Sequence, residues 1–295
     1  MKILMTGGSG FLGRSLVPRL LAAGHQIWAL ARSPKAAATL PAGVNVVMGD
    51  MASLPLSDFP AGMDAVVSLA QSEHFRNFPD RALDVFDVNV RGQLVLLDWA
   101  QRQGVKRFVM ASSGGIYGPK ARPFVAEDEL LAVDSPLGFY LGTKLATELV
   151  FQTYRKQFAA GVILRPFFIY GPGQSADMLV SRLIASVRAG RPIQLQGPDG
   201  LKLNPVFVSD AAAAFVSALA LEGFHVLNVA GPEVVTLRSF CERIGRLVGA
   251  PPRFESAQGS PSDYVASTDA AERVLGKTLV GIDAGLARTL KGESS

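Results

Sequence analysis

Cysteine and histidine are scarce in this sequence, which has one cysteine, Cys241, and three scattered histidines. A single cysteine excludes an intramolecular disulfide framework and any zinc or iron–sulfur site that needs several cysteines. A metal site built from carboxylates alone stays open, but no spacing of acidic residues indicates one. We therefore expect no metal.

Long apolar runs and blocks of like charge are also missing. The longest stretch without Asp, Glu, Lys or Arg covers residues 36–49 and contains Pro41 and Gly43, whereas a spanning helix needs about 18 apolar residues. This excludes a transmembrane protein, and because the first residues lack a signal-peptide core we expect a cytoplasmic location and no membrane partner. The net charge of +4 comes without a run of five like charges, so we expect no nucleic-acid partner. Small anionic ligands explain the basic excess equally well.

Apolar residues are abundant and regularly spaced. With 48% hydrophobic and 18% charged residues among 295, the chain should fold around a large core. Short apolar segments alternate with longer amphipathic ones, as in βαβ units around a buried parallel sheet. The pattern predicts an α/β fold with a Rossmann-type doubly wound parallel sheet and a smaller C-terminal lobe. Strands are expected at Lys2–Thr6, Gln26–Ala31, Val44–Met48, residues 65–69, Arg107–Ala111, and residues 161–165, 204–208 and 226–229, and helices at residues 11–23, 83–103, 137–158, 178–189 and 210–221.

The texture of the sequence changes after Arg165, where turn residues become frequent. We expect residues 1–165 to form a Rossmann domain that binds a nicotinamide dinucleotide and that residues 201–230 complete. Residues 166–200 and 231–295 should form a smaller lobe that binds the substrate.

Three glycines, Gly7, Gly10 and Gly13, lie between the first expected strand and the first expected helix. Glycines there permit a tight turn, a close approach of backbone N–H groups to a pyrophosphate at the helix N-terminus, and close packing of helix on strand. The motif predicts dinucleotide binding. Gly24, at the end of the same helix, is the expected C′ residue.

The second strand ends in Arg32 and Ser33, where NAD enzymes usually place an acidic residue. An arginine there can bind the 2′-phosphate of NADP through two hydrogen bonds, which favours NADP over NAD. The alternative is an ordinary surface arginine. Asp50, after the third strand, is either a contact to the adenine or a turn residue.

Tyr140 and Lys144 lie four residues apart in an expected helix, so their side chains share one face. A nearby ammonium group lowers the pKa of a phenol from about 10 towards neutrality, which makes the tyrosine a proton donor and acceptor. Ser113 follows the fifth strand, at the edge of the sheet where ligands of open α/β folds bind. The three residues are the candidate catalytic group.

Four segments in order resemble the extended short-chain dehydrogenase/reductase family: TGGSGFLG at 6–13, ASSGGIYG at 111–118, YLGTK at 140–144 and LRPFFIYGPG at 164–173. The closest branch is the NAD-dependent epimerase/dehydratase type, which includes nucleotide-sugar epimerases. The resemblance implies that Ser113 hydrogen-bonds the reacting oxygen, Tyr140 transfers a proton, and Lys144 holds the nicotinamide ribose. It also implies a homodimer formed through two long helices.

The resemblance extends to further candidate contacts. Asn89 matches an asparagine of the family that ties active-site groups together, although an asparagine satisfied within its helix is the alternative. The cofactor candidates are Gly7, Gly10, Phe11, Leu12, Gly13, Arg32, Asp50, Met51, Leu69, Ala70, Asn89, Tyr140, Lys144 and Phe167. The substrate candidates are Gln71, Ser112, Gly114, Tyr117, Phe168 and Arg182.

Departures from the family pattern narrow the chemistry. Dehydratases of this branch carry an Asp–Glu pair directly after the serine, where this chain has Gly114 and Gly115, so elimination of water is not expected. Nucleotide-sugar enzymes usually have Asn at Phe168 and Arg at Leu203. We therefore expect an NAD(P)-dependent epimerase or ketoreductase acting on a secondary alcohol or ketone of a small-molecule substrate, such as a nucleotide sugar. The alternatives are a reductase of a hydroxysteroid-like or other small apolar ketone, and a non-catalytic NADP-sensing protein.

Overall fold

The computed structural model describes residues 1–118, 120, 124–129, 131–132 and 137–292. The chain divides into two compact units. The first contains residues 1–116, 133–165 and 212–227, and the second contains residues 117–132, 166–211 and 228–295. The sequence-based division placed residues 117–132, 201–211 and 228–230 with the first unit, whereas here they belong to the second.

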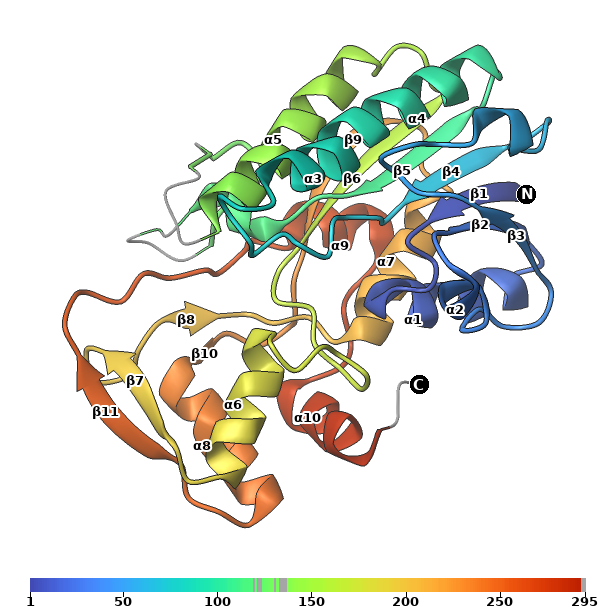
Figure 1. Cartoon of the computed structure of the whole chain (residues 1–295). Coiled ribbons are helices and arrows are strands. Elements are labelled where there is room, and N and C mark those ends of the chain that lie inside the picture. Colours follow the sequence, from blue (N-terminus) through green and yellow to red (C-terminus); the bar gives the residue numbers. More distant parts are fainter. Residues whose placement is uncertain (119, 121–123, 130, 133–136, 293–295) are drawn as a thin grey trace. The chain divides into compact units, whose positions relative to one another are not determined.

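A seven-stranded sheet forms the centre of the first unit (Figure 1). Its order is β3-β2-β1-β4-β5-β6-β9, and the neighbouring strands from β3 to β6 pair in parallel. The chain moves outward from β1 to β3 and then returns to β4 on the other side of β1. The strands are β1 Lys2–Thr6, β2 Gln26–Ala31, β3 Val44–Met48, β4 Ala65–Ser68, β5 Arg107–Ala111, β6 Ala160–Pro166 and β9 Gly223–Val229. The predicted α/β class with a Rossmann-type sheet is confirmed.

Helices cover both faces of this sheet, with α4 and α5 on one face and α1 and α7 on the other (Figure 1). Beneath α4 and α5, strand side chains such as Leu4, Val66 and Phe108 pack against Leu96, Trp99 and Phe151 in a buried apolar cluster. The helical elements are α1 Phe11–Ala22, α2 Pro34–Ala37, η1 Leu56–Asp58, α3 Ala82–Phe86, the π-helix η2 Asp87–Arg91, α4 Gly92–Arg102, η3 Gly114–Tyr117, α5 Gly138–Thr153 and α7 Val208–Ala218.

Two predicted helices of the first unit differ in detail. The expected helix at 83–103 is one continuous helical stretch, but its middle, Asp87–Arg91, is a π-turn. The expected helix at 137–158 ends at Thr153, because Tyr154 and Arg155 bond back to Phe151 and Gln152 in tight turns. Gly24 follows α1 at φ +77°, as a C′ glycine does, and this prediction is confirmed.

The described part of the second unit contains two small sheets and several helices. β7 (Pro192–Gln196) pairs in parallel with β11 (Arg253–Ala257), and β8 (Lys202–Leu203) pairs antiparallel with β10 (Val235–Thr236). Helices α6 (Leu179–Arg188) and α8 (Leu237–Val248) turn their buried apolar sides inward, and α9 (Asp269–Leu275) and α10 (Ile282–Lys291) complete the unit.

The strand expected at 204–208 is wrong. Pro205 has no N–H to give to a ladder, and the Asn204 side chain instead bonds both the N–H and the carbonyl of Ala266, at 3.0 and 2.9 Å. Only Phe207 forms an isolated bridge, to Tyr170, and α7 begins at Val208.

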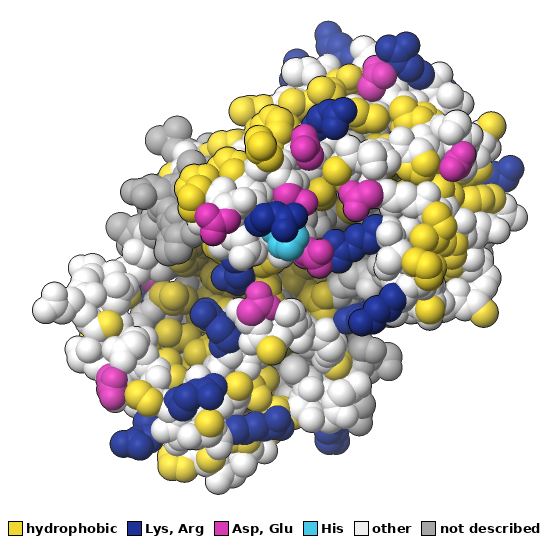
Figure 2. Space-filling view, in the orientation of Figure 1, with side chains coloured by type: hydrophobic (Ala, Val, Ile, Leu, Met, Phe, Trp, Pro, Cys, Tyr) yellow, Lys and Arg dark blue, Asp and Glu magenta, His cyan; other side chains and the backbone are white. Residues whose placement is uncertain are grey.

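The helices of the first unit leave an apolar stripe uncovered. Leu83, Phe86 and Leu94, on α3 and α4, expose 81, 46 and 41% of their surface, and Leu149 on α5 exposes 55%. In Figure 2 hydrophobic side chains gather over these helices. No helix among the described residues is long and apolar enough to cross a membrane.

The glycine loop depends on close backbone packing at Gly13. A Cβ added there would collide with the carbonyl oxygens of Gly7 and Gly8. We expect Gly13→Ala to lower the free energy of unfolding. Moving the backbone atoms costs roughly 1–3 kcal/mol, and the better helix propensity of alanine offsets at most about 1 kcal/mol of this cost.

Gly142→Ala is the matched control, since open space surrounds the missing Cβ of this α5 residue. It should stabilise the chain by up to about 1 kcal/mol. Urea unfolding followed by circular dichroism measures both variants. Equal midpoints for Gly13→Ala and the wild-type chain would contradict the close packing of the loop.

Candidate active site

The glycine loop joins β1 to α1 at the carboxyl edge of the sheet. Gly7 has φ +71°, and a Cβ on it would lie 2.8 Å from the backbone nitrogen of Ala70, which follows β4 with Leu69. Gly10 is the N-cap of α1, with no side-chain cap on the helix and no acidic residue in its first turn, which contains Phe11, Leu12 and Gly13. The positive end of α1 and its first N–H groups are therefore directed at this edge without a competing side chain. The loop fits the pyrophosphate of a dinucleotide.

Lys144 is a buried residue of α5, with 6% of its surface exposed. Its Nζ donates to the carbonyl of Ala111 at 3.1 Å and lies 5.8 Å from the centre of the Tyr140 ring. The first contact fixes α5 against the carboxyl end of β5. Burial lowers the pKa of Lys144 to about 8, although the nearby carboxylate of Glu148 opposes the shift.

Tyr140 lies one helical turn before Lys144 and is 8% exposed. Its hydroxyl donates to Gln71 Oε1 at 2.8 Å. Burial raises the pKa of the Tyr140 hydroxyl above its usual range, and the charge of Arg76 works in the opposite direction. The phenol is therefore protonated, and the hydrogen bond that it donates to Gln71 stabilises this neutral form. This direction is opposite to the lowering expected from the neighbouring ammonium group, because burial is the largest influence on the hydroxyl.

Ser113 lies two residues beyond β5, and its Oγ accepts a hydrogen bond from the N–H of Gly115 at 3.1 Å. A Cβ at Gly115 would lie 2.8 Å from Leu141 of α5 and 3.3 Å from Ser113 Oγ. The serine loop thus packs against the helix that carries Tyr140 and Lys144. Gly114, the first residue of η3, is buried. The buried Oγ of Ser112 has no hydrogen-bond partner among the described residues.

Asn89 lies in the π-turn, and its side-chain amide hydrogen-bonds two other residues of the protein. Its Oδ1 accepts from the N–H of Ser72 at 2.8 Å, and its Nδ2 donates to Thr143 Oγ1 at 3.0 Å. Thr143 in turn donates to the carbonyl of Tyr140 at 2.7 Å. Asn89 therefore links the segment after β4 to the helix of Tyr140, and its amide is satisfied locally.

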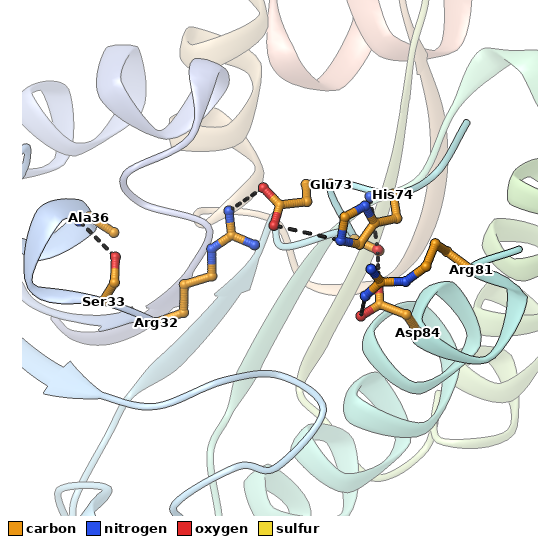
Figure 3. A network of polar contacts seen from close by, with 8 residues as sticks. Arg32, Ser33, Ala36, Glu73, His74, Arg81 and Asp84 are labelled. Carbon is orange, nitrogen blue, oxygen red and sulfur yellow. Dashed lines mark hydrogen bonds and ion pairs between the residues drawn. The ribbon is translucent and has the colours of Figure 1, made fainter. Parts of the chain in front are cut away.

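The residues predicted to meet the adenosine end have protein partners. Asp50 Oδ1 accepts from the N–H of Ala52 at 2.8 Å, as in a turn, and Met51 is buried. Arg32 Nη2 bonds Glu73 Oε2 at 2.7 Å (Figure 3).

Four other candidates lie in the second unit. Tyr117 donates to Asn228 Oδ1 at 2.8 Å and stacks on buried Phe167. Phe168 has φ +45°, a region that bulky residues rarely adopt, and meets Tyr264 edge-on. Arg182 is exposed on α6.

Two buried charges escaped the sequence analysis. Arg165 on β6 forms a paired contact with Glu148 on α5, with Nε–Oε1 at 3.0 Å and Nη2–Oε2 at 2.6 Å, and the side chains are 4 and 0% exposed. Glu148 lies one turn after Lys144, so its place on the same helix face was a readable signal. No group of three or more metal-ligating side chains occurs in the described part of the chain.

This chain is similar in sequence and in structure to several known proteins. The model of the NAD dependent epimerase/dehydratase family matches residues 3–230. A UDP-glucose 4-epimerase from Mycolicibacterium smegmatis is 31% identical, with 99% of this chain and 98% of that protein covered. A dTDP-4-dehydro-6-deoxy-D-allose reductase from a Streptomyces species is 28% identical, with 88 and 85% covered. The structure of MoeE5 in complex with UDP-glucuronic acid and NAD is 29% identical, with 99 and 98% covered and a TM-score of 0.85.

The buried ammonium of Lys144 predicts a specific pH dependence of stability. Its pKa is about 8 in the folded chain and about 10.4 in an unfolded one, so the unfolded chain binds more protons between these values and stability rises with pH there. Lys144→Met removes this contribution. We expect the free energy of unfolding of the wild-type chain, relative to Lys144→Met, to increase by about 2–3 kcal/mol from pH 7 to pH 10.

Urea unfolding at several pH values measures this difference. Lys106→Met, the same substitution at an exposed position, is the control. Parallel pH profiles for the wild-type chain and Lys144→Met would show that burial does not lower the pKa of Lys144.

Proposed function

Because this chain belongs to the NAD dependent epimerase/dehydratase family, we propose that it is a 4-epimerase of a UDP-sugar. The observation that carries the proposal is the arrangement around Tyr140: its hydroxyl is buried and hydrogen-bonded, and Lys144 lies one turn away, tied to the end of β5. MoeE5, which is similar over nearly the whole chain, has been seen with UDP-glucuronic acid and NAD. The UDP-glucose 4-epimerase relative supports the same substrate class.

The residues of the first unit divide the work of the reaction. The glycine loop and α1 would hold the pyrophosphate, and Lys144 would hold the nicotinamide ribose. When bound, the nicotinamide supplies a hydride acceptor and donor. Ser113 orients the C4 oxygen by a hydrogen bond. Tyr140 must first lose its own proton to solvent, and the positive charges of Lys144 and of the bound nicotinamide would favour this phenolate. The phenolate then takes the C4 hydroxyl proton as C4 is oxidised. Tyr140 returns the proton after the 4-keto sugar has presented its opposite face.

Gly114 and Gly115 support this simple redox chemistry. Dehydratases of the family carry an Asp–Glu pair directly after the serine, which serves as acid and base for the loss of water, and the two glycines supply neither. A side chain at Gly115 would also displace Leu141. These facts support an epimerase or a reductase over a dehydratase.

A reductase of a 4-keto nucleotide sugar is the second candidate, favoured by the similarity to the Streptomyces reductase. The two activities differ in how they treat the cofactor. An epimerase must keep the dinucleotide through each turnover, whereas a reductase must exchange it.

We expect purified protein to release nearly one equivalent of dinucleotide on denaturation and to convert UDP-glucose or UDP-glucuronic acid into its C4 epimer without added cofactor. Mass spectrometry of the released molecules and chromatography of the sugars measure these outcomes.

Tyr140→Phe should retain the dinucleotide and lose turnover by at least about 100-fold, because proton transfer is removed. Turnover unchanged in Tyr140→Phe would overturn the mechanism, and consumption of added NADH or NADPH by a 4-keto sugar, without epimer formation, would identify the reductase.

We further propose a homodimer formed through α3, α4 and α5. The exposed stripe of Leu83, Phe86, Leu94 and Leu149 has the spacing of a helix face that packs on another helix pair. A twofold axis would bring two copies of this face together and bury it.

Leu83→Glu combined with Leu149→Glu should convert the dimer to a monomer, because charges cannot be buried in an apolar interface. Light scattering after size-exclusion chromatography measures the mass. Leu279→Glu, at an equally exposed leucine of the second unit (83%), is the control and should remain dimeric. A monomeric wild-type chain would rule out this assembly.

A further inference from the structure

Arg32 and Glu73 form an ion pair beside the glycine loop. Arg32 directly follows β2, and Glu73 lies in the segment after β4. Both strands are direct neighbours of β1 in the sheet, and the glycine loop follows β1. Figure 3 shows the two side chains pointing towards one another, with Arg32 Nη2 and Glu73 Oε2 2.7 Å apart. The ion pair therefore joins the two segments that flank the loop.

Carboxylates dominate the surroundings of Arg32. The hydrogen bond that Arg32 donates to Glu73 is the largest influence that raises the pKa of Arg32, and the charges of Glu73, Asp50 and Asp84 add to it. Arg81, the second guanidinium group labelled in Figure 3, is paired with Asp84 at 3.3 Å. The positive charge at the end of β2 is thus offset before any ligand arrives.

Resting on the proposed nicotinamide-dependent reaction, we infer that Glu73 is a specificity-determining residue that disfavours NADP and lets the chain use NAD. The two cofactors differ at one place, where NAD has a neutral 2′-hydroxyl and NADP a 2′-phosphate with a charge of about −1.5 to −2. Arg32 is the residue that such a phosphate would need. A phosphate bound by Arg32 would either replace Glu73 on the guanidinium or share the guanidinium with it, and in both cases it would lie near the negatively charged Glu73 carboxylate.

The Glu73 carboxylate would also favour the binding of NAD. NAD enzymes usually accept hydrogen bonds from the ribose hydroxyls with an acid at the end of β2, and this chain has none there. Glu73 comes from another loop, and its pairing with Arg32 holds a carboxylate 2.7 Å from the guanidinium of the residue that directly follows β2. A carboxylate accepts from ribose hydroxyls and repels a phosphate, so one side chain favours NAD in both ways.

The preference between the two cofactors would depend on the charge of Glu73 and not on the strength of its ion pair with Arg32. Both side chains are about half exposed, at 52 and 57%, and exposed pairs contribute little to stability. Removing the Glu73 charge should therefore change ligand preference while leaving the fold intact.

Glu73→Gln tests this, because it retains the shape of the side chain and removes its charge. Isothermal titration calorimetry with NAD⁺ and with NADP⁺, on full-length chain freed of any copurified dinucleotide, gives the two dissociation constants. We expect the ratio of the NADP⁺ constant to the NAD⁺ constant to fall about tenfold, with the NAD⁺ constant changed by no more than about threefold. Adding Arg32→Gln to this variant should return the ratio towards the wild-type value.

Glu222→Gln is the matched control. Glu222 pairs with Arg107 at 2.5 Å and is 66% exposed, but Arg107 begins β5, at the amino end of the sheet. Its ratio should equal that of the wild-type chain. A ratio in Glu73→Gln within about twofold of wild type, or a parallel weakening of both cofactors, would overturn the role of Glu73 while leaving the proposed function standing. Failure of the wild-type chain to bind either dinucleotide would instead overturn both.

Discussion

The buried ammonium group of Lys144 is the constraint on which the site depends. A lysine with 6% exposure needs compensation for lost hydration, and here it comes from the carbonyl of Ala111, at 3.1 Å, and from the negative charge of Glu148 one turn away. Glu148 is itself neutralised by Arg165. The three charged groups depend on one another. Without Arg165 the Glu148 carboxylate would be an unpaired buried charge, and without Glu148 the Lys144 ammonium would lose a favourable electrostatic interaction.

The same contacts also fix the positions of Tyr140 and Lys144 relative to the sheet. Lys144, Glu148 and Tyr140 lie on one side of α5, while Ala111 and Arg165 lie on the neighbouring strands β5 and β6. The hydrogen bonds therefore hold α5 at one height along the sheet. Thr143 of the same helix also accepts a hydrogen bond from Asn89 in η2, which adds a further contact that positions α5. The phenol is positioned by the fold and not by its own hydrogen bond to Gln71 alone.

Sequence patterns predicted the parts of this arrangement that are local. The glycine loop and the Tyr140–Lys144 spacing depend on residues within one turn or one helix, and β1, β2, β3 and β5 have the expected bounds. The missed contacts join distant positions: Arg32 and Glu73 are 41 residues apart, and nothing in either neighbourhood marks the partner. Strand β7 was missed for a related reason. Its alternating burial of Ile193 and Leu195 is a strand signal, but its pairing partner, β11, lies far along the chain.

Charge at the end of β2 shows why a single residue type is a poor guide to a ligand. Arg32 taken alone favours a 2′-phosphate, since a guanidinium matches phosphate geometry. In the folded chain the guanidinium belongs to a group that includes Glu73, Asp50 and Asp84, and a ligand responds to the sum of these charges. The relevant quantity is therefore the potential where the ligand binds. Here these charges come from the segments after β2, β3 and β4 and from helix α3, so the potential can change by substitution in any of them without altering the sheet or the group around Tyr140.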